Sequence, residues 1–206
     1  MNNRYEQEPL QKTTLRRVFD YAKGTREPPS CDLTRPPNAG CKTEKGDISD
    51  IQAFKVWKAR LHASPYDVLS HDLECAGRFI ICHGICPVSS SSGAIGQPYC
   101  VRYRGRRGVQ VWKSKRLLRS MVSELSDLLL DERYSFLGHN VVGFDIPILE
   151  GHGLPLGGGV RVLDSMLMMN RLYSELPKGL QYTSTLFCQA PVWKKTLTAQ
   201  SEDKED

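Results

Sequence analysis

The chain has 206 residues, a formal net charge of +5 and 40% hydrophobic residues. This length suits one domain of ordinary size with an appendage, and the modest basic excess permits a polyanionic partner without requiring one. No stretch reaches the roughly 18 apolar residues that span a bilayer, and the N-terminus lacks the apolar core of a secretory signal. Seven cysteines without a Cys-x-x-Cys pair fit a reduced compartment. We therefore expect no membrane partner and a cytoplasmic location.

Residues 1–65 form an N-terminal extension that is partly irregular and to which we assign no function. Residues 14–23 could form a short amphipathic helix, and proline pairs in 24–50 favour an extended loop. Cys31 and Cys41 are two isolated thiols, whereas structural zinc takes four ligands, so a metal site there is disfavoured. Residues 51–61 predict a helix or a strand that packs on the following domain.

The first regular stretch, residues 66–74, reads as a short apolar strand ending in two carboxylates. Asp72 and Glu74 are two positions apart, so a strand would place both side chains on one face. Their charges would repel, and a hard divalent cation between them would remove the repulsion. The alternative is a strand with a solvated acidic end.

The next segments predict the antiparallel part of a sheet. A tight connection at 75–78 leads to a second strand at 79–88, which makes the two strands a hairpin. Segments 99–104 and 109–112 flank a Gly-Arg-Arg-Gly turn and would complete this part. A helix follows from about Ser114, because leucines recur at helical spacing.

A second stretch with candidate site residues follows the strand predicted at 134–138. It runs through His139 and Asn140 to Asp145, which has Phe144 and Ile146 as neighbours. An ionised carboxylate in apolar surroundings is costly unless it is paired or metal-bound. The alternative is an aspartate that caps the short helix predicted at 144–150.

The last predicted elements are a strand at 160–164 and a helix at 165–173. Together the elements predict an α/β fold: three antiparallel strands, then parallel strands alternating with helices in one mixed sheet. Asp164 ends the last strand, where it could cap the helix that begins at residue 165.

Asp-x-Glu at 72–74 and Asn-x-x-x-Phe-Asp at 140–145 resemble the first two exonuclease motifs of the DEDD 3′–5′ exonuclease superfamily. The similarity is closest to the proofreading domains of phage and bacterial DNA polymerases. It implies a ribonuclease-H-like exonuclease domain over residues 66–193, followed by a polar tail at 194–206.

By this resemblance, Asp72, Glu74 and Asp145 are catalytic and hold two divalent cations, Mg²⁺ or Mn²⁺. The resemblance also implies four substrate-binding residues. His139 and Asn140 would position the scissile strand, and two apolar side chains, Leu73 and Phe144, would contact the terminal nucleotide. Asp164 would support these residues or have a purely structural role.

The chain departs from the family pattern at the third motif, a Tyr-x-x-x-Asp or His-x-x-x-Asp that supplies a fourth carboxylate. Four positions after Tyr173 stands Pro177, and four positions after Tyr182 stands Leu186. Either the sequence is a truncated piece of a DNA polymerase, or the site has lost one ligand, which would weaken metal binding.

The resulting hypothesis is a metal-dependent 3′–5′ exonuclease acting on single-stranded DNA 3′ ends in a bacterial or phage-infected cell. A polymerase domain or subunit would be a further partner. Two alternatives remain open: a catalytically impaired nucleic-acid-binding module of the same fold, and a ribonuclease. Residues 102–119 contain eight Lys and Arg and no Asp or Glu, which fits a nucleic-acid backbone and equally a solvated surface.

Overall fold

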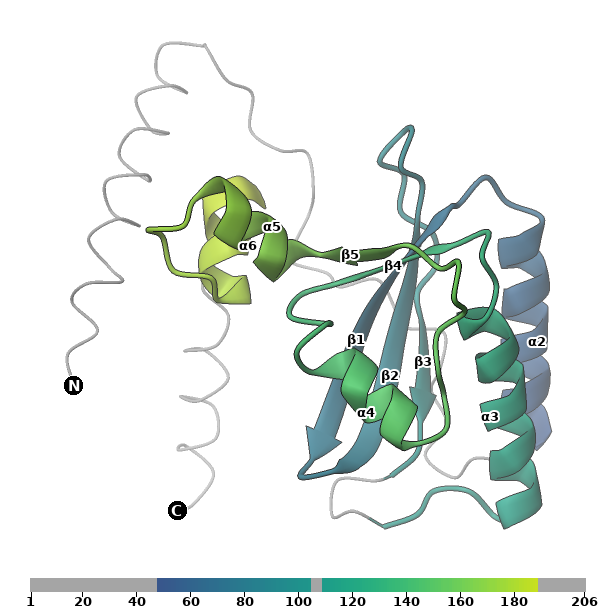
Figure 1. Ribbon diagram of the computed structural model, residues 1–206. Helices are drawn as coiled ribbons and strands as arrows, with labels where there is room; N and C mark the ends of the chain where they lie inside the picture. The colour runs from purple at the N-terminus through teal and green to yellow at the C-terminus, as the bar shows by residue number, and fades with distance from the viewer. Residues whose placement is uncertain (1–47, 105–108, 189–206) are drawn as a thin grey trace, which may run out of the picture. The chain divides into compact units, whose positions relative to one another are not determined.

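The computed structural model describes residues 48–104 and 109–188 (Figure 1). These fall into two compact units, 48–165 and 166–188. The predictions for residues 14–23, for Cys31 and Cys41, and for the tail at 194–206 lie outside the described residues. The unit 48–165 contains both sequence motifs.

A five-stranded sheet forms the centre of this unit. Its strands are β1 (Val68–Ala76), β2 (Phe79–Val88), β3 (Tyr99–Arg102), β4 (Ser135–Gly138) and β5 (Val162–Asp164), in the order β3-β2-β1-β4-β5. β1, β2 and β3 pair antiparallel, whereas β4 joins β1 and β5 joins β4 in parallel. The α/β mixed sheet of ribonuclease-H-like type predicted from the sequence is therefore confirmed.

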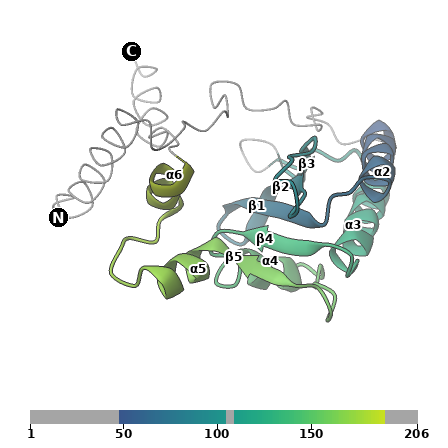
Figure 2. The same cartoon turned by 90° about the horizontal axis from the view of Figure 1, so that it is seen from above.

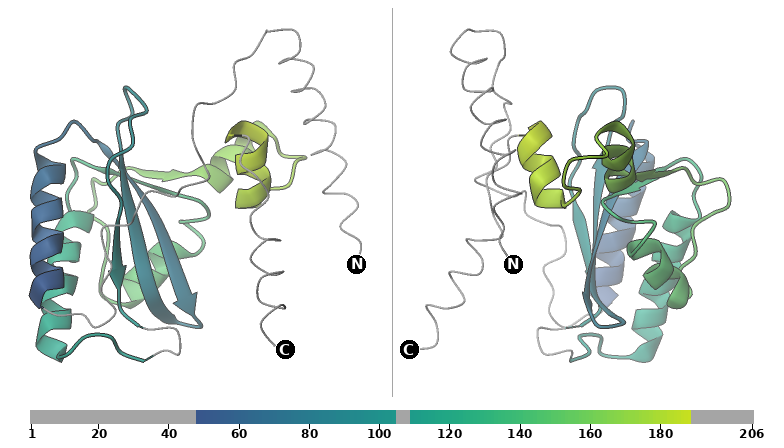
Figure 3. Two further views of the ribbon diagram at one scale, coloured as in Figure 1. Left: turned by 180° about the vertical axis from the view of Figure 1, so that it is seen from behind. Right: turned by 60° about the vertical axis from the view of Figure 1, so that its left-hand side comes forward.

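Three helices of the unit pack on the sheet: α2 (Ile48–His62), α3 (Lys115–Leu129) and α4 (Asp145–Gly151). Segment 51–61 is thus a helix rather than a strand. α3 begins where its sequence predicts, since the Ser114 side chain accepts the Leu117 amide hydrogen at 3.2 Å. Figures 2 and 3 show α2 and α3 side by side.

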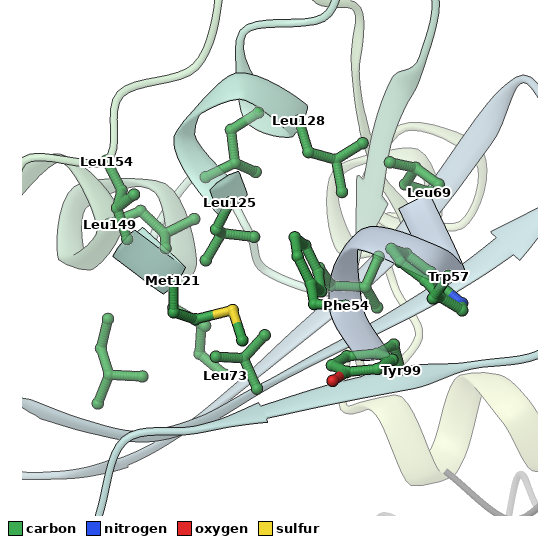
Figure 4. Close-up of a cluster of buried hydrophobic side chains, with 14 of the residues drawn as sticks. Phe54, Trp57, Leu69, Leu73, Tyr99, Met121, Leu125, Leu128, Leu149 and Leu154 are labelled. Carbon is green, nitrogen blue, oxygen red and sulfur yellow. The ribbon is translucent and has the colours of Figure 1, made fainter. Parts of the chain in front are cut away.

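The hydrophobic core lies on one face of the sheet, beneath these helices (Figure 4). Phe54 and Trp57 of α2 pack against Tyr99 of β3, with ring centroids 5.2 and 5.4 Å from the tyrosine ring. Met121 and Leu125 of α3 complete the same cluster with residues of β1 and α4. Aromatic and aliphatic side chains from strand and helix therefore bury a single core.

The second predicted hairpin is shorter than expected. β3 ends at Arg102, and residues 109–112 form no strand; a single antiparallel bridge joins Arg104 to Gln110. The amides of Tyr103 and Arg104 both donate to the Ile81 carbonyl, which breaks the regular pairing. Trp112 instead buries its ring and donates its indole N–H to the Arg102 carbonyl at 2.8 Å.

The unit 166–188 contains most of α5 (Ser165–Leu172) and α6 (Leu180–Cys188). The sequence predicted α5 but not α6. Tyr182 is buried in α6, and the ring of Tyr173 lies 5.7 Å from that of Phe187. Among the described helices, none has the length and apolarity needed to cross a membrane.

Candidate active site

The two motifs meet where β1 extends beyond its parallel neighbour. β4 pairs with β1 only along Val68–Ser70, although β1 continues to Ala76. The amide of Leu73 therefore has no β4 carbonyl opposite it. The carboxylate of Asp145 takes this place, with Oδ1 accepting the Leu73 N–H at 3.0 Å. A buried hydrogen bond thus joins positions 72 residues apart in sequence.

The strand places its carboxylates as the two-residue spacing predicts. His71 and Leu73 are buried on the helix-covered face, whereas Asp72 and Glu74 are exposed. Across the hairpin, Asp72 lies opposite Gly84 and Glu74 opposite Cys82. The exposed carboxylates therefore border a small residue and a thiol, with no bulky partner directly across from Asp72.

Asp145 is a buried carboxyl group with an unfavourable charge. It is 4% exposed, and burial is the main cause that raises its pKa to about 6. The charges of Asp72 and Asp164 also raise this pKa, whereas the hydrogen bond from the Leu73 amide lowers it. Asp145 therefore ionises near neutral pH at an energetic cost, which a nearby cation would reduce.

Cys75 follows Glu74 at the end of the acidic motif, and the charges of all three predicted carboxylates influence its thiol. Burial raises the pKa of its thiol, and the charges of Asp145, Glu74 and Asp72 raise it further. Sequence reasoning assigned no role to Cys75, which follows the Asp-x-Glu motif directly. A thiol whose pKa is raised in this way is poorly suited to be a thiolate nucleophile.

The loop between β4 and α4 is fixed by Asp164. Its two carboxylate oxygens accept the amides of Asn140 at 2.9 Å and Val142 at 3.1 Å. Asn140 has a φ of 64°, a left-handed conformation that asparagine tolerates. At Gly143 a Cβ would lie 2.6 Å from Asn140 Oδ1. The spacing from Asn140 to Asp145 thus encodes a tight loop that delivers the aspartate.

The structural alternative required Asp145 to cap the helix that follows, and it does not do so. The residue before α4 in the cap position is Phe144, and it makes no side-chain cap hydrogen bond. Asp145 occupies the first turn of the helix and directs one oxygen to β1. Phe144 remains 43% exposed beside it.

His139 and Leu73 contribute differently from each other. The Ser165 hydroxyl donates to the Gly138 carbonyl at 3.1 Å and lies 2.9 Å from His139 Nδ1. The Ser165 hydroxyl thus links the His139 ring to the end of β4. The Leu73 side chain is buried in the core (Figure 4), so its amide is the group that faces Asp145.

Sequence reasoning missed a buried pair of histidines on the neighbouring strands β1 and β2. His71 Nδ1 lies 2.8 Å from His83 Nε2, and the His71 ring stacks on Phe136 at 3.9 Å. Burial lowers the pKa of His83 to about 3, and burial with the charge of His83 lowers that of His71 well below its usual range. The pair is therefore neutral. Its only sequence signal was the alternation of His71 with Leu69 and Leu73.

The donor set fits a hard cation in its chemistry but is not preassembled for one. Carboxylate oxygens suit Mg²⁺ and Mn²⁺. However, within 48–104 and 109–188 no three His, Cys, Asp or Glu side chains are grouped closely enough to hold a metal ion. The described helix α6, with sequence LQYTSTLFC, supplies no carboxylate. The roles assigned to Asp72, Glu74 and Asp145 remain predictions.

No family model and no curated protein matches this sequence. Among solved structures, the chain is similar to the EXD2 exonuclease domain soaked in Mn and GMP, with 21% identity and a TM-score of 0.36, over 75% of this chain and 71% of that one. It is also similar to exonuclease I, with 15% identity and a TM-score of 0.41, over 58% of this chain and 35% of that one. The structure of E. coli exonuclease I with a dT13 oligonucleotide is similar at 13% identity, with a TM-score of 0.38, over 54% of this chain and 30% of that one.

Proposed function

We propose that the chain is a divalent-metal-dependent 3′–5′ exonuclease domain that acts on single-stranded DNA ends, as polymerase proofreading domains do. One observation carries the proposal: the hydrogen bond from the Leu73 amide to Asp145 brings the second motif to the Asp-x-Glu motif. The raised pKa of Asp145, caused by burial and the charge of Asp72, supports it further. Perturbed carboxyl groups of this kind concentrate at functional sites.

Asp72, Glu74 and Asp145 would hold two divalent cations, Mg²⁺ or Mn²⁺. Bound cations would supply activation of a water molecule and stabilisation of the phosphate charge during in-line attack. Because the described helix α6 supplies no carboxylate, we expect weak metal binding and millimolar metal requirements.

The remaining residues would orient the DNA strand. His139 is held through Nδ1 by the Ser165 hydroxyl, so its Nε2 would be the ring atom that contacts the strand or a bound water. Exposed Phe144 offers a ring for the terminal base. Asp164 would hold the Asn140 loop in place without touching the substrate.

Digestion of a 3′-labelled single-stranded DNA oligonucleotide in Mg²⁺ or Mn²⁺ tests the proposal. Wild-type protein should release nucleoside monophosphates, and Asp72→Asn should be at least a hundredfold slower, since metal ligation contributes several kcal/mol to such reactions. Asp127→Asn is the matched control, because this carboxylate is exposed on α3. Equal rates for wild type and Asp72→Asn would remove this site as the source of activity.

Two other functions remain under test in the same assay. The lack of a three-ligand group among the described residues favours a binding module with little turnover, which would bind DNA in a salt-sensitive manner without releasing nucleotides. A ribonuclease would digest a matched RNA oligonucleotide faster than DNA. A 5′-labelled substrate reports the polarity of digestion.

We propose the cytoplasm of a bacterial or phage-infected cell as the location of this protein.

A further inference from the structure

A groove runs along α4 towards the tip of the β1–β2 hairpin. Its volume is about 650 Å³, and its walls come from Gly77, Arg78 and Phe79 of the hairpin and from Phe144, Pro147 and His152 on the α4 side. Phe79 is 54% exposed and Phe144 43% exposed. The groove therefore begins next to Asp145, at Phe144, and carries two exposed aromatic rings.

A second cavity continues from the first. It has a volume of about 320 Å³ and shares Phe79 and His152 with the groove, and it extends to Tyr103, Arg104 and Gln110. The guanidinium of Arg104 lies 4.3 Å from the centre of the Phe79 ring. Phe79 thus stands between the two cavities, with one ring face towards an arginine.

The charge of this surface has one sign. The described residues that line the two cavities include Arg78, Arg104 and His152 but no Asp or Glu. Exposed aromatic rings alternating with basic side chains match a single strand of nucleic acid, in which bases stack and phosphates pair with arginines. A purely apolar peptide would gain nothing from the arginines, so we favour the nucleic acid.

We infer that this surface, from Phe144 through Phe79 to Arg104, binds the single strand that leads away from the 3′ end. Phe79 would be the central stacking platform, and Arg78 and Arg104 would contact phosphates. The inference rests on the proposed function for its direction, because Phe144 directly precedes Asp145 in the chain. Strand binding itself does not require turnover.

Fluorescence anisotropy of a labelled dT10 strand with the full chain, in EDTA, tests the binding surface separately from catalysis. Phe79→Ala should weaken binding about tenfold, since stacking on one aromatic side chain contributes roughly 1–3 kcal/mol per base. Val56→Ala is the matched control, because Val56 is 51% exposed on α2, and it should leave binding unchanged. Equal affinity of Phe79→Ala and wild type would overturn the inference, as would a wild type that binds no strand.

The arginines give a second readout. Arg78→Ala and Arg104→Ala should each lower the slope of log affinity against log salt by about 0.7, the value for one lost single-strand phosphate contact. Arg60→Ala, which removes the same charge from the exposed surface of α2, should leave the slope unchanged. Unaltered slopes for both groove variants would contradict phosphate contacts and leave an apolar ligand as the occupant.

Hydrolysis of thymidine 5′-monophosphate p-nitrophenyl ester separates failure of this surface from failure of the nuclease proposal. This small substrate would occupy only the carboxylate site, so Phe79→Ala should cleave it at the wild-type rate while losing affinity for dT10. If wild type cleaves neither the ester nor the labelled DNA oligonucleotide, but Phe79→Ala still loses affinity for dT10, the binding surface stands and the nuclease proposal fails. If Phe79→Ala lowers the rate of ester hydrolysis by the same factor as the affinity for dT10, Phe79 acts at the carboxylate site and the proposed strand path is wrong.

Discussion

Asp145 at the start of α4 and Asp164 at the end of β5 are equally buried, at 4% and 5% exposure, but their charges are used differently. Asp164 accepts the amides of Asn140 and Val142 with its two oxygens. Asp145 accepts the Leu73 amide with one oxygen and feels the repulsion of Asp72. The carboxylate of Asp164 is stabilised by two amide hydrogen bonds. By contrast, burial and the charge of Asp72 make ionisation of Asp145 unfavourable.

We propose that this difference separates a structural carboxylate, Asp164, from a functional one, Asp145. A carboxylate that satisfies backbone amides stabilises its loop. A carboxylate whose pKa is raised by burial and a like charge destabilises the fold when it is ionised, and carboxyl groups perturbed in this way concentrate at functional sites. The next variants test the comparison, from the largest expected effect to the smallest.

The largest effect should be on turnover in Asp145→Asn. The asparagine keeps an oxygen for the Leu73 amide but loses the charge, so nucleotide release should fall by a factor of about 100 to 1,000. Initial rates on single-stranded DNA in Mn²⁺ measure this. Circular dichroism should show an unchanged fold, and a variant with normal turnover would make Asp145 as structural as Asp164.

Asp164→Ala should affect stability most. It leaves the amides of Asn140 and Val142 without these acceptors, so the free energy of unfolding should fall by about 2–3 kcal/mol. Urea denaturation measures the change, with exposed Asp127→Ala as control. A loss below about 0.5 kcal/mol would mean that water replaces the carboxylate, and the contrast between the two aspartates would weaken.

Asp145→Asn should be more stable than wild type above pH 6. The folded-state pKa of Asp145 is about 6, above the usual 3.8, so its contribution to stability is full below about pH 4 and is lost as pH rises through 6. The gain in the variant should be about 1–2 kcal/mol at pH 7.5 and absent at pH 4. His71 and His83, whose lowered pKa values destabilise both proteins below pH 6.5, cancel in the difference. Equal urea midpoints for variant and wild type at pH 7.5 would show that Asp145 bears no charge strain.

Gly143→Ala should give the smallest effect. Its Cβ would meet Asn140 Oδ1, the end of a side chain that can turn, so stability should fall by about 1 kcal/mol. Turnover should drop more than stability predicts if Asn140 positions the strand. Rates that track stability alone would assign Asn140 to the loop rather than to the substrate.

Sequence reasoning predicted the sheet and the two motifs because their signals are local. Alternation along residues 68–74 and leucines at helical spacing in α3 report periodicity that a single segment carries. The hydrogen bond between Leu73 and Asp145 follows from strands of unequal length, β1 outreaching β4. No local pattern states that length difference, so the contact was expected only from the resemblance.

The missed features depend on the partners of a residue rather than on its own type. His71 and His83 become a pair only through the register that sets β1 against β2. Phe79 becomes an exposed ring between two cavities only when the hairpin tip meets α4. Residues 109–112 looked like a strand, yet the burial of Trp112 took precedence over pairing.

Binding of Mn²⁺, followed by electron paramagnetic resonance of the free ion, tests most directly whether the two motifs form one cation site. Wild-type protein should remove Mn²⁺ from solution, and Asp72→Asn and Asp145→Asn should each raise the dissociation constant at least tenfold, with Asp127→Asn unchanged. Equal dissociation constants in all four proteins would show that the carboxylates at the end of β1 and the start of α4 do not share an ion.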